Sequence, residues 1–259
     1  MSDPFPAVTE ASATGEVAEL FADIRATVGV RVVNLVWRHL ATIDGALPWA
    51  WAAVKPLYLQ GVPDQATVRF RESMTVPKLA SLAGPQPAGV DDVLASYDHS
   101  NTMNLFALGA LGAWLRGETA KEGTPVTGRR LPAPDVTLPK LNSADDVSAE
   151  TWALVLRLNK FGDRPQPIIL ASMYRQLAFA PQFLMQVENA LTPAQADGSL
   201  DRAITANRAA AEVQSRLLAR AIEAGRPKEA ARIESGIAAF VEHAIGKMVT
   251  ICRAIRAAR

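Results

Sequence analysis

Apolar residues recur at steps of three or four along most of this chain, which is the spacing of a helix that buries one face. The C-terminal stretch shows this most clearly, because Ile233, Ile237, Phe240, Ala244 and Met248 share one stripe with polar residues between them. Strand-like alternation and Asn-Gly hairpin turns are missing. We therefore predict an all-α fold, with helices over residues 16–28, 32–43, 49–60, 64–74, 91–115, 201–224 and 227–255.

Several residues mark where these helices should begin, bend or end. Asp64 and Asp91 could each cap the N-terminus of the helix that follows. Pro56 predicts a kink or break, because proline lacks the N–H that the helix needs. Gly225 could end the penultimate helix in a left-handed conformation, which would place Pro227 in the first turn of the last helix.

The chain also divides near its middle. Residues 118–147 are rich in proline and glycine, which indicates a surface linker between a helical unit at 1–117 and a second one at 148–259. Residues 37–41 (WRHLA) match residues 174–178 (YRQLA), and the pair at 98–99 (DH) matches the pair at 242–243 (EH). These matches predict two helical repeats that are related by a pseudo-twofold axis and packed into one compact unit, with a cleft at their seam.

Composition narrows the function without naming it. The 259 residues are 49% hydrophobic and 20% charged with a net charge of +1, so we expect neither a nucleic acid nor a membrane as partner. Cys252 is the single cysteine, which fits a reducing, cytoplasmic setting. No phosphate loop, dinucleotide fingerprint or zinc spacing is present, so we expect no cofactor and no metal. The oligomeric state stays open, a homodimer included.

Short motifs near the N-terminus resemble a known family. GEV at 15–17, DIR at 23–25, RxLAT at 38–42 and LPxAW at 47–51 are similar to the opening of the group I 2-haloacid dehalogenases. The similarity continues at Asn101 and at AxxP over 178–181, as scattered identities along nearly the whole chain. It implies an all-α fold of two related halves with the active site between them. It also implies an enzyme that hydrolyses both enantiomers of small 2-halo acids.

The resemblance assigns roles to individual positions. In this family an aspartate activates water for direct attack on the carbon that bears the halogen, and an asparagine helps to hold that water. Asn101 falls on the water-positioning asparagine, and Ser172 on the serine that precedes the aspartate. The aspartate position falls on Met173. Two pocket aromatics fall on Val32 and Leu35, and a tyrosine of the last helix falls near residue 241.

Methionine cannot accept a proton, so the family's base is absent from its expected place. A positioned base typically contributes about 10²–10⁴ in rate. Asp98 is one helical turn before Asn101 and is the best candidate for a relocated base, with a surface carboxylate or a helix cap as the alternative. Arg38 could receive a substrate carboxylate or form a structural salt bridge. Tyr174 could line the pocket or only pack.

Three functions remain open at this point. The first is a dehalogenase-like hydrolase for a small carboxylic acid that uses another base. The second is a non-catalytic protein that binds a small acid or an apolar metabolite. The third is a helical interaction protein without a pocket. A carboxylate facing the seam cavity would favour the first of these, and a wall of uncharged side chains would favour the second.

Overall fold

Helices form almost all the regular structure of the computed structural model, which describes residues 5–82, 84–122, 128–162 and 169–259. No strand occurs in these described ranges, so the predicted all-α fold is confirmed. The α-helices are α1 (Gly15–Val28), α2 (Leu35–Leu40), α3 (Ala46–Leu59), α4 (Val62–Ser73), α5 (Val90–Arg116), α6 (Ala149–Leu158), α7 (Ser172–Leu177), α8 (Pro181–Ala196), α9 (Ser199–Leu218), α10 (Ala230–Ala238) and α11 (Gly246–Ala257). Short 3-10 turns occupy Ala144–Asp146 and Ala219–Ala221, and a π-helical segment, Ala239–Ile245, joins α10 to α11.

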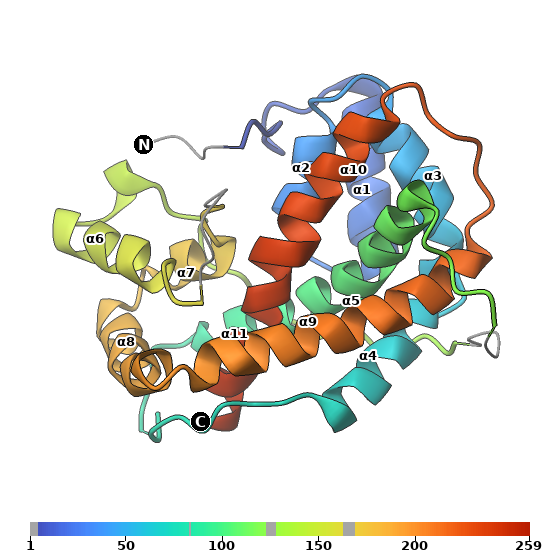
Figure 1. Cartoon of the computed structure of the whole chain (residues 1–259). Helices are drawn as coiled ribbons and strands as arrows, with labels where there is room; N and C mark the ends of the chain where they lie inside the picture. The colour runs from blue at the N-terminus through green and yellow to red at the C-terminus, as the bar shows by residue number, and fades with distance from the viewer. Residues whose placement is uncertain (1–4, 83, 123–127, 163–168) are drawn as a thin grey trace.

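Helix α5 runs through the middle of the molecule. It packs against α9, α11, α4, α10 and α3 (Figure 1), and most of its side chains are buried. The predicted range, 91–115, differs from the observed one by a single residue at each end, and the residues just beyond it, Gly89 and Gly117, have left-handed backbones. The run of apolar residues around the whole circumference of α5 is explained by this central position.

The apolar interior forms two clusters that meet along α5. One cluster combines α1 to α4, the second half of α5, and α10. The other combines the start of α5 with α6, α7, α8 and most of α11. Figure 1 shows α6 to α8 on one side of the molecule and α1 to α3 on the other. Each cluster takes helices from both sides of the predicted linker, so the boundaries at 117 and 148 do not separate two cores. The internal duplication stays a prediction.

Several predicted helix ends are wrong. Pro56 lies in the last turn of α3, which continues to Leu59 without a break. The caps of α4 and α5 are Gly61 and Gly89, so neither Asp64 nor Asp91 caps a helix. Gly225 does not have a left-handed backbone. It does not end the penultimate helix either, since α9 already ends at Leu218. The last helix begins at Ala230, three residues after the proline that was expected in its first turn.

Helix α2 is shorter than predicted because tertiary contacts hold the preceding residues extended. The backbone N–H of Val33 donates to Glu10 Oε1 at 2.8 Å, and Asn34 has an extended ψ of 146°. The extended backbone of Asn34 interrupts a helix over 32–43, so α2 begins only at Leu35. Helix α7 has the same six-residue length, and each short helix ends at the matched Leu-Ala pair.

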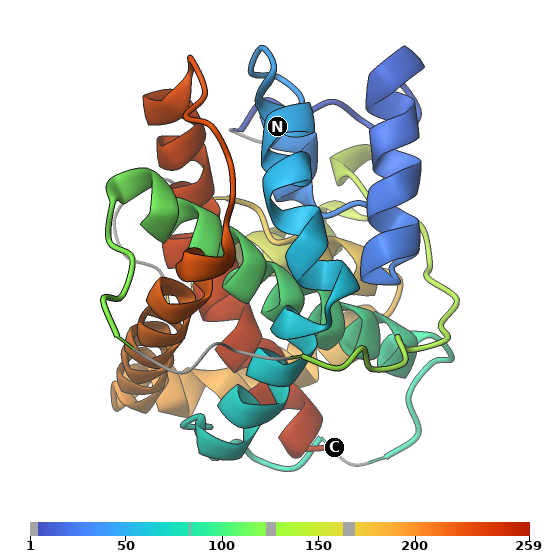
Figure 2. The same ribbon diagram turned by 90° about the vertical axis from the view of Figure 1, so that its right-hand side faces the viewer.

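The described part of residues 118–147 follows the surface, where contacts with the helices hold it in place. Its backbone passes so close to Gly61 that a Cβ there would lie 2.3 Å from backbone atoms of Arg129 and Arg130, and Gly61 has a φ of +69°. Asp64 accepts a hydrogen bond from the N–H of Leu131 at 3.0 Å. The extended chain is seen beside α4 in Figure 2. Residues 123–127 of this predicted linker lie outside the described residues.

The C-terminal helix is continuous over Ala230–Ala257 and is apolar for its length. It is the one stretch of the described chain whose length and composition would allow a membrane crossing. However, 61% of its most apolar window is buried inside the protein, where it packs against α5 and α9. This burial is typical of a core helix, and it accounts for the apolar composition.

Candidate functional site

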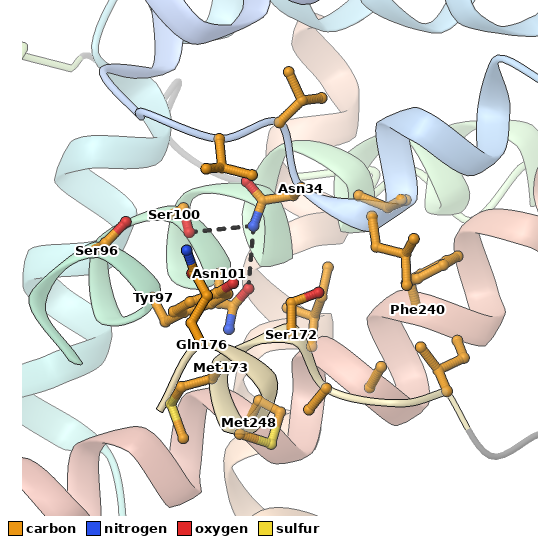
Figure 3. A pocket seen from close by; sticks show the side chains of 18 of the residues that line it. Asn34, Ser96, Tyr97, Ser100, Asn101, Ser172, Met173, Gln176, Phe240 and Met248 are labelled. Carbon is orange, nitrogen blue, oxygen red and sulfur yellow. Dashed lines mark hydrogen bonds between the residues drawn. The ribbon is translucent and has the colours of Figure 1, made fainter. Parts of the chain in front are cut away.

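A cavity of about 60 Å³ lies where the two apolar clusters meet. We call it the seam cavity, and Figure 3 shows it from close by. Its walls come from four stretches of chain that are distant in sequence: residues 32–38, 96–101, 169–176 and 240–248, with Leu138 of the linker. The lining therefore includes residues from both predicted units. The lining residues are Val32, Val33, Asn34, Leu35, Val36, Arg38, Ser96, Tyr97, Ser100, Asn101, Leu138, Ile169, Leu170, Ala171, Ser172, Met173, Gln176, Phe240, Ala244, Ile245 and Met248.

Six of the eight residues predicted for the site line this cavity. They are Asn101, Val32, Leu35, Ser172, Met173 and Arg38. The first turn of α7 brings Ser172 and Met173 to the wall, and Met173 is buried there (Figure 3). Residues that are more than 130 positions apart in the sequence thus meet in one wall.

The other two predicted residues do not line the cavity. Tyr174 is fully buried in the cluster of α6 to α8, where it packs. Asp98 is also buried, and its Oδ2 accepts from Arg71 Nη2 at 2.8 Å and from Arg256 Nη1 at 3.1 Å. Two positive charges hold this carboxylate outside the cavity. The placement of Asp98 does not fit the expectation that it supplies a relocated base.

A polar network crosses one wall of the cavity. Asn34 Nδ2 donates to Ser100 Oγ at 3.2 Å and to Asn101 Oδ1 at 3.4 Å, as drawn in Figure 3. With its oxygen occupied in this way, the NH₂ group of Asn101 is left to donate to another molecule, because no hydrogen bond in the described structure uses it. A water or a ligand oxygen could accept that bond.

Tyr97 and Arg38 are the two ionisable residues of the described lining. Burial raises the pKa of the Tyr97 phenol, while the positive charge of Arg38 and a hydrogen bond with Ser172 oppose that effect. Tyr97 therefore remains a neutral hydrogen-bond donor at physiological pH. Arg38 lies on α2, is buried, and brings a positive charge into the wall.

Among the described residues, the lining contains no Asp, Glu, His, Lys or Cys. Such a wall offers no general base to a bound water. The described chain has no group of three or more His, Cys, Asp or Glu side chains that could hold a metal ion. The described wall combines the positive charge of Arg38 with mostly apolar side chains.

Sequence reasoning missed several lining residues. Asn34, Ser96, Ser100 and Gln176 supply most of the remaining polar groups. Gln176 belongs to the repeated YRQLA motif, which could have drawn attention to it. Phe240, which helical spacing already placed on the apolar stripe, lines the cavity as the aromatic residue of the C-terminal helix, whereas position 241 does not.

The sequence matches no family model and no curated protein. Solved structures do match over nearly the whole length. One is a D-2-haloacid dehalogenase mutant, with a TM-score of 0.77, 17% identity, and coverage of 99% of this chain and 97% of that chain. A second, in complex with D-2-CPA, has a TM-score of 0.76, and a third, in complex with L-LA, has 0.75, at the same identity and coverage. The chain has a D-2-haloacid dehalogenase-like fold. At this level of identity the D-2-haloacid dehalogenase similarity concerns the fold alone.

Proposed function

We propose that this chain is a divergent relative of the group I 2-haloacid dehalogenases that binds a small monocarboxylic acid in the seam cavity without hydrolysing it. The observation that carries this proposal is the charge of the wall. Arg38 is the one charged side chain of the described lining, and most of the other lining side chains are apolar. A positively charged side chain in a mostly apolar wall suits a ligand with one negative charge and an apolar remainder.

The volume sets the size of that ligand. A cavity needs about 10–15 Å³ of volume that a water-sized sphere can enter to hold one water molecule. About 60 Å³ therefore accommodates an acid of roughly five non-hydrogen atoms. The ligand carboxylate would lie beside Arg38, and Tyr97 and the NH₂ group of Asn101 would donate hydrogen bonds. The apolar substituent would contact Leu35, Met173 and similar side chains.

The absence of turnover follows from Met173. The resemblance places the family's water-activating aspartate at this position, and Met173 faces the cavity there. A thioether does not accept a proton, so a water beside Asn101 would keep its ordinary low reactivity. A buried apolar side chain at this position also encloses the ligand, which favours binding.

Binding is tested by calorimetry with the two enantiomers of 2-chloropropionate and with uncharged 2-chloropropanamide. We expect the acids to bind at least tenfold more tightly than the amide, and Arg38→Gln to remove this preference. Arg69→Gln is the matched control, because Arg69 is exposed on α4 and does not line the cavity. Equal binding of acid and amide would support an apolar metabolite as the ligand. Absence of binding by all three would contradict a pocket for a small molecule.

Hydrolysis is the second candidate, favoured by the Asn34–Ser100–Asn101 network that could hold a water. Chloride release from both enantiomers separates the two functions. We expect none from the natural chain and measurable release from Met173→Asp. The control is Met185→Asp on α8, where methionine is 48% exposed and does not line the cavity. Release by the natural chain would overturn the non-catalytic proposal.

A further inference from the structure

Two arginines hold one carboxylate outside the seam cavity. Arg71 of α4 and Arg256 of α11 both donate to the same oxygen, Oδ2, of Asp98 on α5. Arg71 also donates to the backbone carbonyl oxygen of Asp98 at 3.0 Å. One buried negative charge is thus shared between two guanidinium groups, and one positive charge is not compensated.

Arg253 adds a second uncompensated charge. It lies three residues before Arg256 on α11, so both side chains leave the same face of the helix. Burial lowers the pKa of the Arg71 guanidinium; Asp98 opposes this effect, and the like charges of Arg253 and Arg256 reinforce it. Arg253 has no hydrogen-bond or ion-pair partner in the part of the chain that the structure describes. The cluster therefore carries a surplus of two positive charges.

One donor of the cluster is also buried without a partner. Arg71 Nε is inaccessible to solvent and makes no hydrogen bond within the described structure. A buried N–H without an acceptor is costly, and such atoms often mark a place where another group binds. The neighbouring Arg259 needs no such explanation, because it donates to Asp91 and lies over the ring of Phe183.

We propose that Arg71, Arg253 and Arg256 form a binding site for a phosphate dianion, either free or as the phosphate group of a phosphomonoester. A phosphate carries about −1.5 to −2 charges near pH 7, which matches the surplus. Guanidinium groups present planar forks of donors that fit phosphate oxygens in pairs. A carboxylate would neutralise only half of the surplus. The site is separate from the seam cavity, so it does not depend on the proposed binding of a small acid.

Calorimetric titration of the whole chain tests this site, with inorganic phosphate and with phenyl phosphate at constant ionic strength. The diagnostic variant is Arg253→Gln, because it removes a charge and leaves both ion pairs of Asp98 intact. The control is Arg69→Gln, which removes an exposed arginine two residues from Arg71 and hence from another face of α4. We expect Arg253→Gln to weaken phosphate binding at least tenfold, and Arg69→Gln to change it less than twofold.

The melting temperature without phosphate provides the check on folding. Arg253→Gln should melt at the natural temperature or above it, because the substitution relieves repulsion between like charges. Binding of phenyl phosphate alone would identify a phosphomonoester as the ligand, and binding of inorganic phosphate alone would identify free phosphate. Absence of binding for both, or an equal loss in the two variants, would overturn the proposal.

Discussion

Arg208 on α9 donates a hydrogen bond to the backbone carbonyl oxygen of His243 at 3.1 Å, inside the π-helical segment Ala239–Ile245. A π-turn interrupts the regular helical ladder, and a side-chain donor from a neighbouring helix stabilises it. The same segment separates two hollows of the protein. Phe240 faces the seam cavity, whereas Val241 and His243 line a surface groove of about 500 Å³ between α5 and α9.

Gly246→Ala should destabilise this arrangement. A Cβ at position 246 would lie 2.6 Å from the carbonyl oxygen of Val241 and 2.9 Å from Arg208 Nε, so the π-helical segment would have to shift. We expect the free energy of unfolding to fall by about 1–3 kcal/mol, measured by urea denaturation. Gly225→Ala is the control, since no heavy atom lies within 4 Å of its added Cβ. Equal stability of the two variants would contradict the close packing of Gly246 against Val241 and Arg208.

Asn104 holds a buried polar contact beside the cavity. Its Oδ1 accepts from Trp37 Nε1 at 2.8 Å and from the Tyr58 hydroxyl at 2.9 Å. Asn104→Leu leaves both donors buried without an acceptor. We therefore expect the free energy of unfolding, measured by urea denaturation, to fall by about 2–5 kcal/mol. Adding Tyr58→Phe removes one orphaned hydroxyl. The double variant should therefore be more stable than the sum of the single losses predicts, by at least about 0.5 kcal/mol. If the losses of unfolding free energy simply add, the finding that Tyr58 and Trp37 share Asn104 as acceptor would be contradicted.

His99 should make stability depend on pH. Burial lowers its pKa from the ordinary 6.5, although the hydrogen bond between Nε2 and the carbonyl oxygen of Val28 opposes the effect. Above about pH 6.5 the imidazole is neutral in both the folded and the unfolded chain, so His99 does not lower the free energy of unfolding there. As the pH falls below that value, the unfolded chain takes up a proton that the folded chain resists, so the free energy of unfolding decreases.

The variant His99→Gln tests this dependence, since an amide can still donate to the Val28 carbonyl. We expect it to flatten the decline of the unfolding free energy between neutral and mildly acidic pH. His243→Gln should retain the decline, because His99 is still present. A natural chain whose stability does not fall over this interval would show that His99 titrates alike in both states.

Cys252 should be unreactive until the protein unfolds. Its thiol is fully buried and donates to the Leu94 carbonyl oxygen at 3.4 Å, and burial raises the pKa of the thiol. A chromogenic disulfide reagent should therefore label it only at the rate of structural opening, and at once in denaturant. Met185→Cys, with one exposed thiol added on α8, should react with a single fast equivalent in the native state. Fast labelling of the natural chain would contradict the packing of α11 on α5.

The sequence by itself determined the all-α class and most helix positions, because helices depend on contacts within a few residues. The predicted range 91–115 agrees with α5 to within one residue at each end, and left-handed glycines lie just beyond it. The resemblance also selected six residues that line one cavity. These results depend on the helix-forming tendency of short segments and on the identity of single residues, and both can be read from the sequence.

Only the tertiary structure decided which side chains meet. Glu10 accepts a hydrogen bond from Val33 just before α2, and two arginines from distant helices hold Asp98 outside the cavity. Phe240 lines the seam cavity, whereas Val241 lines the groove between α5 and α9. Each of these outcomes depends on partners that are remote in sequence, and local spacing carries no information about such partners. The charge of the cavity wall, on which the proposed function rests, is set by the same long-range packing.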